Sequence, residues 1–193
     1  MGRWQEISPD GKALEGIKMA QKIIALSGPR ACGKSTIAKH LVSQHGYTRI
    51  AFADALRDVA SIGNSERMND RLYLACLGEK LRELLPDFLL QVLQHRLESI
   101  DGHIVIEDIR FPTEVEFCHM LGAMSVRLEI PVETQRERLA SRDGKLGVEA
   151  DLLINCEDEN ALGMVGDWGH VIPAVGDFRK LASKLDMLAL KVK

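Results

Sequence analysis

The sequence lacks the features that would assign the chain to a membrane, to an oxidising compartment or to zinc. No apolar run in its 193 residues approaches the roughly 20 residues that a membrane-spanning helix needs. The first ten residues contain no apolar core of a signal peptide. The four cysteines form no CxxC pair, and the six histidines form no metal-ligand pair at helical spacing. We therefore expect a cytoplasmic protein with free, mostly buried thiols, no membrane contact and no zinc.

The chain also lacks a surplus of positive charge. Its formal net charge is −3 and its pI about 6.1, so nothing in the overall balance points to nucleic acid, although a local basic cleft remains compatible. A hydrophobic content of 46% with 27% charged residues is ordinary for a globular protein. No repeat, low-complexity tract or interdomain linker is present. We predict an N-terminal extension over residues 1–21 and one domain over residues 22–193.

Short apolar runs alternate with helical patterns along the chain. This alternation predicts an α/β fold, with a five-stranded parallel sheet sandwiched by helices. The stretch from about 54 to 100 reads as mostly helical, with interruptions near residues 63–64 and at Pro86. The strands are expected at residues 22–27, 49–53, 103–107, 125–130 and 170–172, and the other helices at 35–44, 112–121, 132–142 and 177–190.

A glycine-rich segment follows the first predicted strand and matches the phosphate-loop pattern G-x-x-x-x-G-K-[ST] in full. Glycine lets the backbone wrap around phosphate oxygens, and the following helix offers them its positive N-terminus. We expect Lys34 to bridge the β- and γ-phosphates of ATP and the Ser35 hydroxyl to bind Mg²⁺. Cys32 could act as a redox switch, but a small filler residue is the simpler interpretation. The predicted ATP-binding residues are Gly28, Pro29, Arg30, Ala31, Cys32, Gly33, Lys34, Ser35 and Thr36.

Acidic residues end the third predicted strand, where open α/β sheets bind their ligands. Asp108 is the favoured candidate for holding magnesium or orienting an acceptor. Glu107 is its neighbour, but side chains alternate along a strand, so only one of the two should face the site. A helix-capping role for Asp108 is the competing interpretation. Arg110 could clamp an acceptor phosphate in bidentate fashion, or could simply be a solvated surface arginine.

A charged helix follows the fourth predicted strand and places Arg138 and Arg142 on one face, four residues apart. Such a face is most often only solvated. In a phosphate-loop protein, however, arginines carried by a moving lid stabilise the charge that develops on the transferred phosphoryl group. We therefore assign both arginines catalytic roles in a lid over residues 135–160.

These segments together resemble the nucleoside monophosphate kinases of the P-loop NTPase fold, most closely the bacteriophage-type deoxynucleoside monophosphate kinases. The stretch from Gln135 to Gly144 is similar to the lid of dephospho-CoA kinases. If a phage encodes the chain, its compartment would be the host cytoplasm. The likeness covers about residues 22–188 and is carried by the loop at 27–36, by IAFADALR at 50–57, by VIEDIRFPTE at 105–114, and by the ending at 158–162, 168–172 and 176–178.

The resemblance implies roles for further residues. It makes the helical region at 54–100 the acceptor-binding part, and it gives Asp54 and Asp108 catalytic roles beside Lys34 and the lid arginines. Three departures bear on the acceptor: Arg57 stands where lysine is usual, Phe88 where tryptophan is usual, and residues 173–175 replace a turn containing asparagine. The acceptor-binding residues implied by the resemblance are Asp54, Arg57, Arg82 and Arg110.

Three functions remain open from the sequence. The leading hypothesis is a kinase that uses ATP and Mg²⁺ to phosphorylate a small nucleotide acceptor, a (deoxy)nucleoside monophosphate; a homodimer is compatible with it. The second is a kinase of a hydroxyl group, in dephospho-CoA or in a hydroxymethylated pyrimidine that is free or within DNA. That reaction would need Asp54 or Asp108 as a general base. The third is an ATP-binding switch protein without catalysis, which would not need the acceptor arginines.

Overall fold

The computed structural model describes residues 22–144, 146–155, 161–163, 165 and 167–191. The predicted extension at 1–21 lies outside this part. The chain divides into two compact units. One consists of Ile50–Gly102, and the other of Lys22–Arg49 together with His103–Lys193. We call them the helical unit and the P-loop unit. The helical unit covers nearly the same residues as the region predicted to bind the acceptor.

A five-stranded sheet carries the fold, with the strands in the order β2-β3-β1-β4-β5. The first strand lies in the middle and pairs in parallel with β3 on one side and β4 on the other, and β5 pairs in parallel with β4. This confirms the prediction of an α/β fold with a five-stranded parallel sheet. The strands are β1 (Ile23–Ser27), β2 (Thr48–Ala51), β3 (Ile104–Ile109), β4 (Met124–Glu129) and β5 (His170–Pro173).

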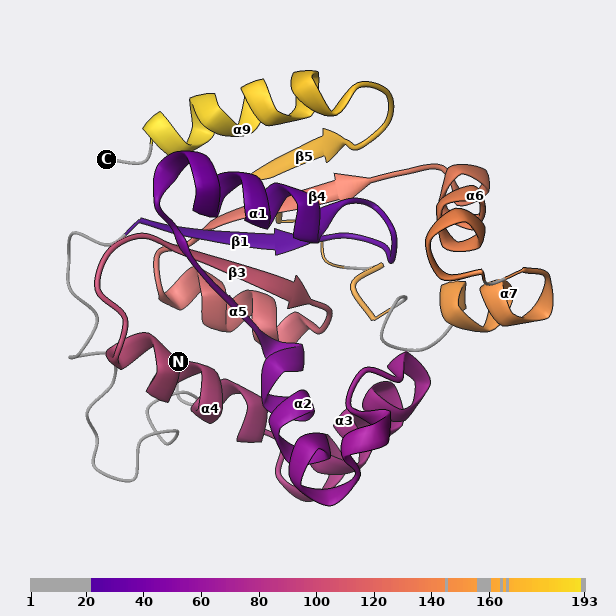
Figure 1. The fold of residues 1–193 in the computed structure, drawn as a ribbon. Coiled ribbons are helices and arrows are strands. Elements are labelled where there is room, and N and C mark those ends of the chain that lie inside the picture. The colour runs from indigo at the N-terminus through magenta and orange to yellow at the C-terminus, as the bar shows by residue number, and fades with distance from the viewer. Residues whose placement is uncertain (1–21, 145, 156–160, 164, 166, 192–193) are drawn as a thin grey trace. The chain divides into compact units, whose positions relative to one another are not determined.

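Helices cover both faces of the sheet in the P-loop unit. Helices α1 and α9 lie over one face and α5 lies against the other (Figure 1). Residues of β1 are buried throughout, as expected of a strand covered on both faces. In the described residues of this unit, the helices are α1 (Lys34–His45), α5 (Pro112–Met120), α6 (Val132–Asp143), α7 (Val148–Ile154) and α9 (Phe178–Lys191).

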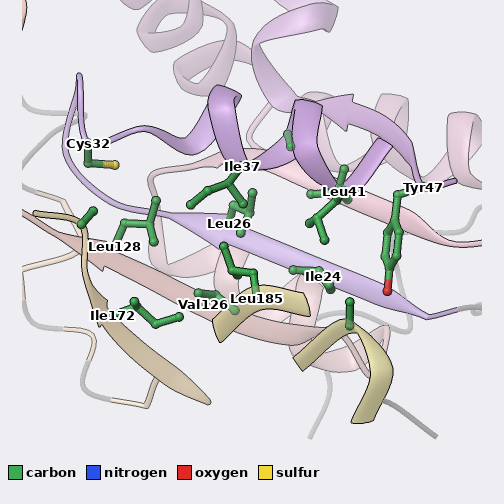
Figure 2. Close-up of a cluster of buried hydrophobic side chains, with 14 residues drawn as sticks. Ile24, Leu26, Cys32, Ile37, Leu41, Tyr47, Val126, Leu128, Ile172 and Leu185 are labelled. Carbon is green, nitrogen blue, oxygen red and sulfur yellow. The ribbon is translucent and has the colours of Figure 1, made fainter. Parts of the chain in front are cut away.

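One core fixes α1 and α9 to the sheet. Ile37 and Leu41 project from α1 toward Leu26 of β1, and Leu185 of α9 joins them (Figure 2). Each such side chain contributes about 1.5–3 kcal/mol when it leaves water. The start of α1 is therefore held firmly at the end of β1.

The helical unit begins within β2. Pro86 separates α3 from α4 and Gly63 ends α2, so the two predicted interruptions are confirmed. Asp70 caps α3, because its side chain accepts hydrogen bonds from the backbone N–H groups of Leu72 and Tyr73. The elements of this unit are α2 (Phe52–Gly63), the 3-10 turn η1 (Ser65–Arg67), α3 (Arg71–Leu84) and α4 (Phe88–Glu98).

Two predicted strand ends are wrong. The second strand was expected to reach residue 53, but it ends at Ala51 and Phe52 starts α2. Phe52 is buried at helical spacing with Ala55 and Leu56, so its apolar side chain belongs to the helix face. The third strand runs two residues beyond its expected end at Glu107, so Asp108 lies inside it.

The prediction that the free thiols are mostly buried is confirmed for two of the three described cysteines. Cys32 and Cys118 are buried free thiols, whereas Cys76 is exposed; Cys156 lies outside the described residues. In the described part of the chain, no helix has both the length and the apolar character required for crossing a membrane.

Candidate active site

The phosphate loop connects the end of β1 to the start of α1. Its backbone has positive φ angles at Gly28 (138°), Ala31 (61°) and Gly33 (108°). A Cβ atom at Gly28 would collide with the backbone oxygen of Leu128 on β4. Only glycine satisfies both the torsion and the space at this position. The loop is therefore bent tightly against the sheet and leads directly into the helix N-terminus.

Lys34 folds back over the loop. Its ammonium nitrogen donates hydrogen bonds to the carbonyl oxygens of Gly28 at 2.6 Å and Pro29 at 3.0 Å, and the residue is only 6% exposed. A buried ammonium group needs such acceptors to offset the loss of water. Ser35 and Thr36 are exposed in the first turn of α1. Partial positive charge gathers at such a helix start, which suits an anion.

Arg138 of α6 reaches the same loop. Its Nη1 donates to the carbonyl oxygens of Ala31 and Cys32 at 3.3 Å each, and its Nη2 donates to that of Ala174 at 2.9 Å. The side chain is half-buried, so this face of α6 is not merely solvated. Arg142 is exposed one turn further along. The two predicted lid arginines thus have different surroundings.

Asp108 lies in a bulge of β3. Ala25 of β1 pairs with Ile106 and Ser27 with Ile109, so two residues of β3 stand opposite one residue of β1. Asp108 has a φ of 61°, which a non-glycine residue rarely adopts. A bulge interrupts the regular alternation of side chains. Regular alternation would let only one of Glu107 and Asp108 face the site, and the bulge breaks that alternation at these two residues.

Glu107 forms an ion pair with Arg49. Its Oε2 accepts a hydrogen bond from Nε of Arg49 at 2.7 Å, and its side chain is 1% exposed. Asp108 is only half-buried. Burial and pairing make Glu107 a structural carboxylate and leave Asp108 as the more accessible of the two.

Glu114 fixes the segment after β3, a role that the sequence analysis missed. Its Oε2 accepts hydrogen bonds from the backbone N–H groups of Arg110 at 2.8 Å and Phe111 at 3.3 Å. The residue is buried and stands third in α5, after Pro112. Glutamate at that position of a helix is a known capping signal, which could have revealed the role. Through these bonds Glu114 sets the backbone that carries Arg110.

The helical unit holds the other three candidates. Asp54 is the third residue of α2, and its Oδ1 accepts a hydrogen bond from Nη1 of Arg57 at 2.7 Å. Arg82 of α3 lies along its own helix over Gly78, where a Cβ atom would come within 3.1 Å of its Nη1. Gly78 thus makes room for the guanidinium group, and neither composition nor spacing had singled it out.

The candidates therefore fall into two sets, each within one unit. Asp54, Arg57 and Arg82 belong to the helical unit, and the other predicted site residues belong to the P-loop unit. Within the second set, Ser35 and Asp108 offer a hydroxyl and a carboxylate beside the ends of β1 and β3. Oxygen atoms of this kind are the ligands that magnesium prefers, so the donor chemistry fits that ion.

A loop of this form, between the central strand of a parallel sheet and its first helix, defines the class of P-loop nucleotide-binding domains. Within this class, the chain belongs to the AAA_18 family, whose model, described as AAA domain, matches residues 24–159. The predicted membership of the P-loop kinases is confirmed. A protein of Acanthamoeba polyphaga mimivirus with the provisional name deoxynucleotide monophosphate kinase is 24% identical over an alignment of 143 residues, with 56% of this chain and 74% of that protein covered.

Solved structures share the fold, and two of them are named as kinases. A gluconokinase from Sinorhizobium meliloti 1021 superposes with a TM-score of 0.56 at 16% identity. The superposition covers 91% of this chain and 97% of the gluconokinase chain. Shikimate kinase from Acinetobacter baumannii, in complex with shikimate, gives 0.56 at 20% identity, with 90% and 97% covered. TT1252 from Thermus thermophilus gives 0.59 at 20% identity, with 90% and 98% covered. At these identities the likeness establishes the fold alone.

Proposed function

We propose that the chain transfers the γ-phosphoryl group of ATP to a (deoxy)nucleoside monophosphate, which yields ADP and the corresponding diphosphate. The observation that carries the proposal is the convergence of two cationic side chains, Lys34 and Arg138, on one phosphate loop. A loop that gathers two positive charges at the N-terminus of a helix is suited to a polyphosphate. The mimivirus relative, whose name gives this activity, supports the choice of acceptor.

The P-loop unit is assigned to ATP. The loop Gly28–Thr36 binds the phosphates, and Lys34 exchanges its carbonyl partners for the β- and γ-phosphate oxygens. Arg138 and Arg142 neutralise charge on the transferred group. Ser35 and Asp108 would hold Mg²⁺, which supplies further charge neutralisation when it is bound.

The helical unit is assigned to the acceptor. Arg57 and Arg82 supply guanidinium groups for its phosphate. Asp54 orients Arg57 through their hydrogen bond. A phosphate acceptor is already ionised at neutral pH, so positioning and charge neutralisation suffice without a strong base. The pairing of Asp54 with an arginine fits that chemistry.

The activity is tested by a screen of acceptors in a phosphoryl-transfer assay. ADP release should depend on one or more nucleoside monophosphates, with dephospho-CoA and hydroxymethyluracil-containing DNA as the other arms. Lys34→Ala should lower turnover by about 10²–10³-fold because a transition-state cation is lost. Lys39→Ala is the matched control, since Lys39 is exposed on the same helix. Turnover of the Lys34→Ala protein at the wild-type rate would refute the proposed mechanism.

The acceptor assignment is tested within the helical unit. Arg57→Ala and Arg82→Ala should each raise the acceptor KM by about ten- to a hundredfold, because each removes charged hydrogen bonds. The KM for ATP should hardly change. Lys80→Ala is the control, because Lys80 is exposed on the same helix as Arg82 and pairs with Glu79 and Glu83 on that helix. Equal effects on both substrates would contradict the division of labour.

A hydroxyl acceptor is the second candidate, and the fold favours it in one respect. Two structural neighbours are a gluconokinase and a shikimate kinase, whose acceptors are not nucleotides. A hydroxyl must lose its proton as it attacks, and a general base contributes about 10²–10⁴-fold to that step. Asp54→Asn or Asp108→Asn should therefore abolish transfer to a hydroxyl while only weakening transfer to a phosphate. A DNA substrate belongs to this candidate alone.

The third candidate is an ATP-binding switch without catalysis. It would bind ATP through the same loop but show no acceptor-dependent ADP release. Binding of ATP to the purified chain, combined with no stimulation by any acceptor in the screen, would favour it over both kinase proposals.

A further inference from the structure

Three metal-ligating side chains meet in the P-loop unit, away from the phosphate loop. Nε2 of His40 and Nε2 of His45, both on α1, lie 2.7 Å from the same Oδ1 of Asp186 on α9. The three potential ligand atoms all lie within 4.8 Å of one another. At 1.5 Å per residue, His40 and His45 are about 9 and 16 Å along α1 from Lys34. The cluster is thus separate from the residues assigned to ATP and magnesium.

The surroundings of the cluster suit an ion better than a closed hydrogen-bond network. The side chains of His40, His45 and Asp186 are 18%, 21% and 35% exposed, so solvent and ions can reach them. The ring of His40 packs edge-on against Phe178 at 5.8 Å, which limits its rotation.

Binding of one ion would change the separations of the three ligand atoms, which lie within 4.8 Å of one another. Two ligands bound at 2.0–2.1 Å to a tetrahedral zinc ion lie about 3.3–3.4 Å apart. The observed 2.7 Å separations would therefore have to open by about 0.6 Å. Two imidazoles and one carboxylate, with a water molecule as the fourth ligand, form a known zinc ligand set. Magnesium prefers oxygen ligands alone and fits poorly.

We propose that His40, His45 and Asp186 bind one divalent transition-metal ion of the zinc type, which clamps α9 to the helix that carries the phosphate loop. The site is independent of the proposed transfer reaction. Its role is to fix α1 from its far end, through a bond between segments 141 residues apart in sequence.

Metal titration of the full-length chain tests the proposal. After treatment with a chelator and its removal by dialysis, Zn²⁺ should bind with one equivalent in calorimetry, and Co²⁺ should give the visible absorption of a four-coordinate site. Asp186→Asn and His45→Ala should each weaken binding by about tenfold or more, since even supporting residues contribute that much. Asp186→Asn keeps the side-chain shape, so its folding should be retained. A millimolar excess of Mg²⁺ should not compete.

Two matched variants make the result specific. His95→Ala removes an exposed histidine of the helical unit and should bind zinc as the wild type does. Lys34→Ala should also bind zinc normally, because it affects only the phosphate loop. At zinc concentrations about a hundredfold above the Kd, the melting temperature should rise by about 5–10 °C in these proteins and not in Asp186→Asn. Absence of saturable binding, or binding unchanged in both Asp186→Asn and His45→Ala, would overturn the proposal.

Discussion

Individual side chains in the P-loop unit show how positive charge is held at the phosphate loop. Lys34 and Arg138 both donate hydrogen bonds to carbonyl oxygens of the loop. These carbonyl partners offset the water that the two cations lose on burial. The loop is therefore organised around positive charge by contacts within the protein itself.

Asp108 carries local backbone strain. A left-handed conformation costs a non-glycine residue about 1–2 kcal/mol and persists only where the surroundings impose it. The bulge in β3 imposes it here, one strand away from the phosphate loop. Strain of this kind is concentrated at functional sites, which supports the assignment of Asp108 as a site residue.

Thiol reactivity provides a prediction at the level of residues. Burial raises the pKa of the Cys118 thiol well above its ordinary value, with Glu114 adding to the effect, so little thiolate forms. Cys76 is exposed. In the native protein, an alkylating reagent at neutral pH should label Cys76 much faster than Cys118, as peptide mass spectrometry can measure. Labelling in denaturant is the control, and there the two rates should become similar. Equal rates in the native protein would contradict the burial of Cys118.

At the level of elements, α3 depends on its N-cap. Asp70 accepts hydrogen bonds from two backbone N–H groups at the start of that helix and from the side chain of Arg67. The hydrogen bond from Arg67 is the largest cause of a lowered Asp70 pKa, followed by that from Tyr73. The charged form of Asp70 is thus favoured in the folded state.

Removal of this cap should destabilise the protein. We expect Asp70→Ala to cost about 1 kcal/mol of unfolding free energy, measured by denaturant titration. Because the folded pKa is lowered, the contribution exists above the ordinary value of 3.8 and is lost as the pH falls through the folded value. The difference between wild type and Asp70→Ala should therefore shrink at strongly acidic pH. A difference that grows on acidification would contradict the assignment.

Two glycines within helices should respond differently to alanine. Gly63 ends α2 with open space around its Cβ position, so Gly63→Ala should stabilise the protein by up to about 1 kcal/mol. A Cβ at Gly78 would come within 3.1 Å of both Arg82 and Leu56. Gly78→Ala should lose that gain and, by displacing Arg82, should raise the acceptor KM. Denaturant titration and acceptor kinetics measure the two effects. Gly63→Ala is the control. An unchanged acceptor KM in Gly78→Ala would contradict an influence of Gly78 on the proposed acceptor site.

For the molecule as a whole, the strand order determines where the chemistry is placed. The first strand lies between β3 and β4, so the loop after β1 and the bulge of β3 lie on adjacent strands. Loops at the carboxyl ends of parallel strands share one edge of the sheet, which is where ligands bind in such folds. The fold therefore assembles the phosphate loop, Asp108 and Arg110 at one edge.

Nucleotide binding should stabilise the whole chain. A non-hydrolysable ATP analogue with Mg²⁺, at about a hundredfold its Kd, should raise the melting temperature by about 5–10 °C. Lys34→Ala should lose most of this shift, and Lys39→Ala should keep it. Omission of magnesium should also reduce it, and omission is preferable to a chelator because a chelator would strip the proposed zinc site as well. An equal shift in Lys34→Ala would contradict the role of Lys34.

Much of the fold could be predicted because its signals are local. The phosphate loop occupies consecutive residues between an apolar strand and an amphipathic helix, so the pattern itself carries the structure. Pro86 and Gly63 likewise marked helix ends by their own backbone properties. The end of β2 was missed because Phe52 suits both a buried strand and a helix face, and only packing decides between them.

The sequence by itself determined the P-loop, the α/β class and the candidate cations, because each depends on residues close together in the chain. Only the tertiary structure decided that Arg138 binds a loop 107 residues away, that Asp108 sits in a bulge, and that Asp186 joins two histidines of α1. Those contacts join distant segments whose meeting is set by strand order and core packing. A local pattern cannot encode such a meeting, because the partners have no fixed spacing along the chain.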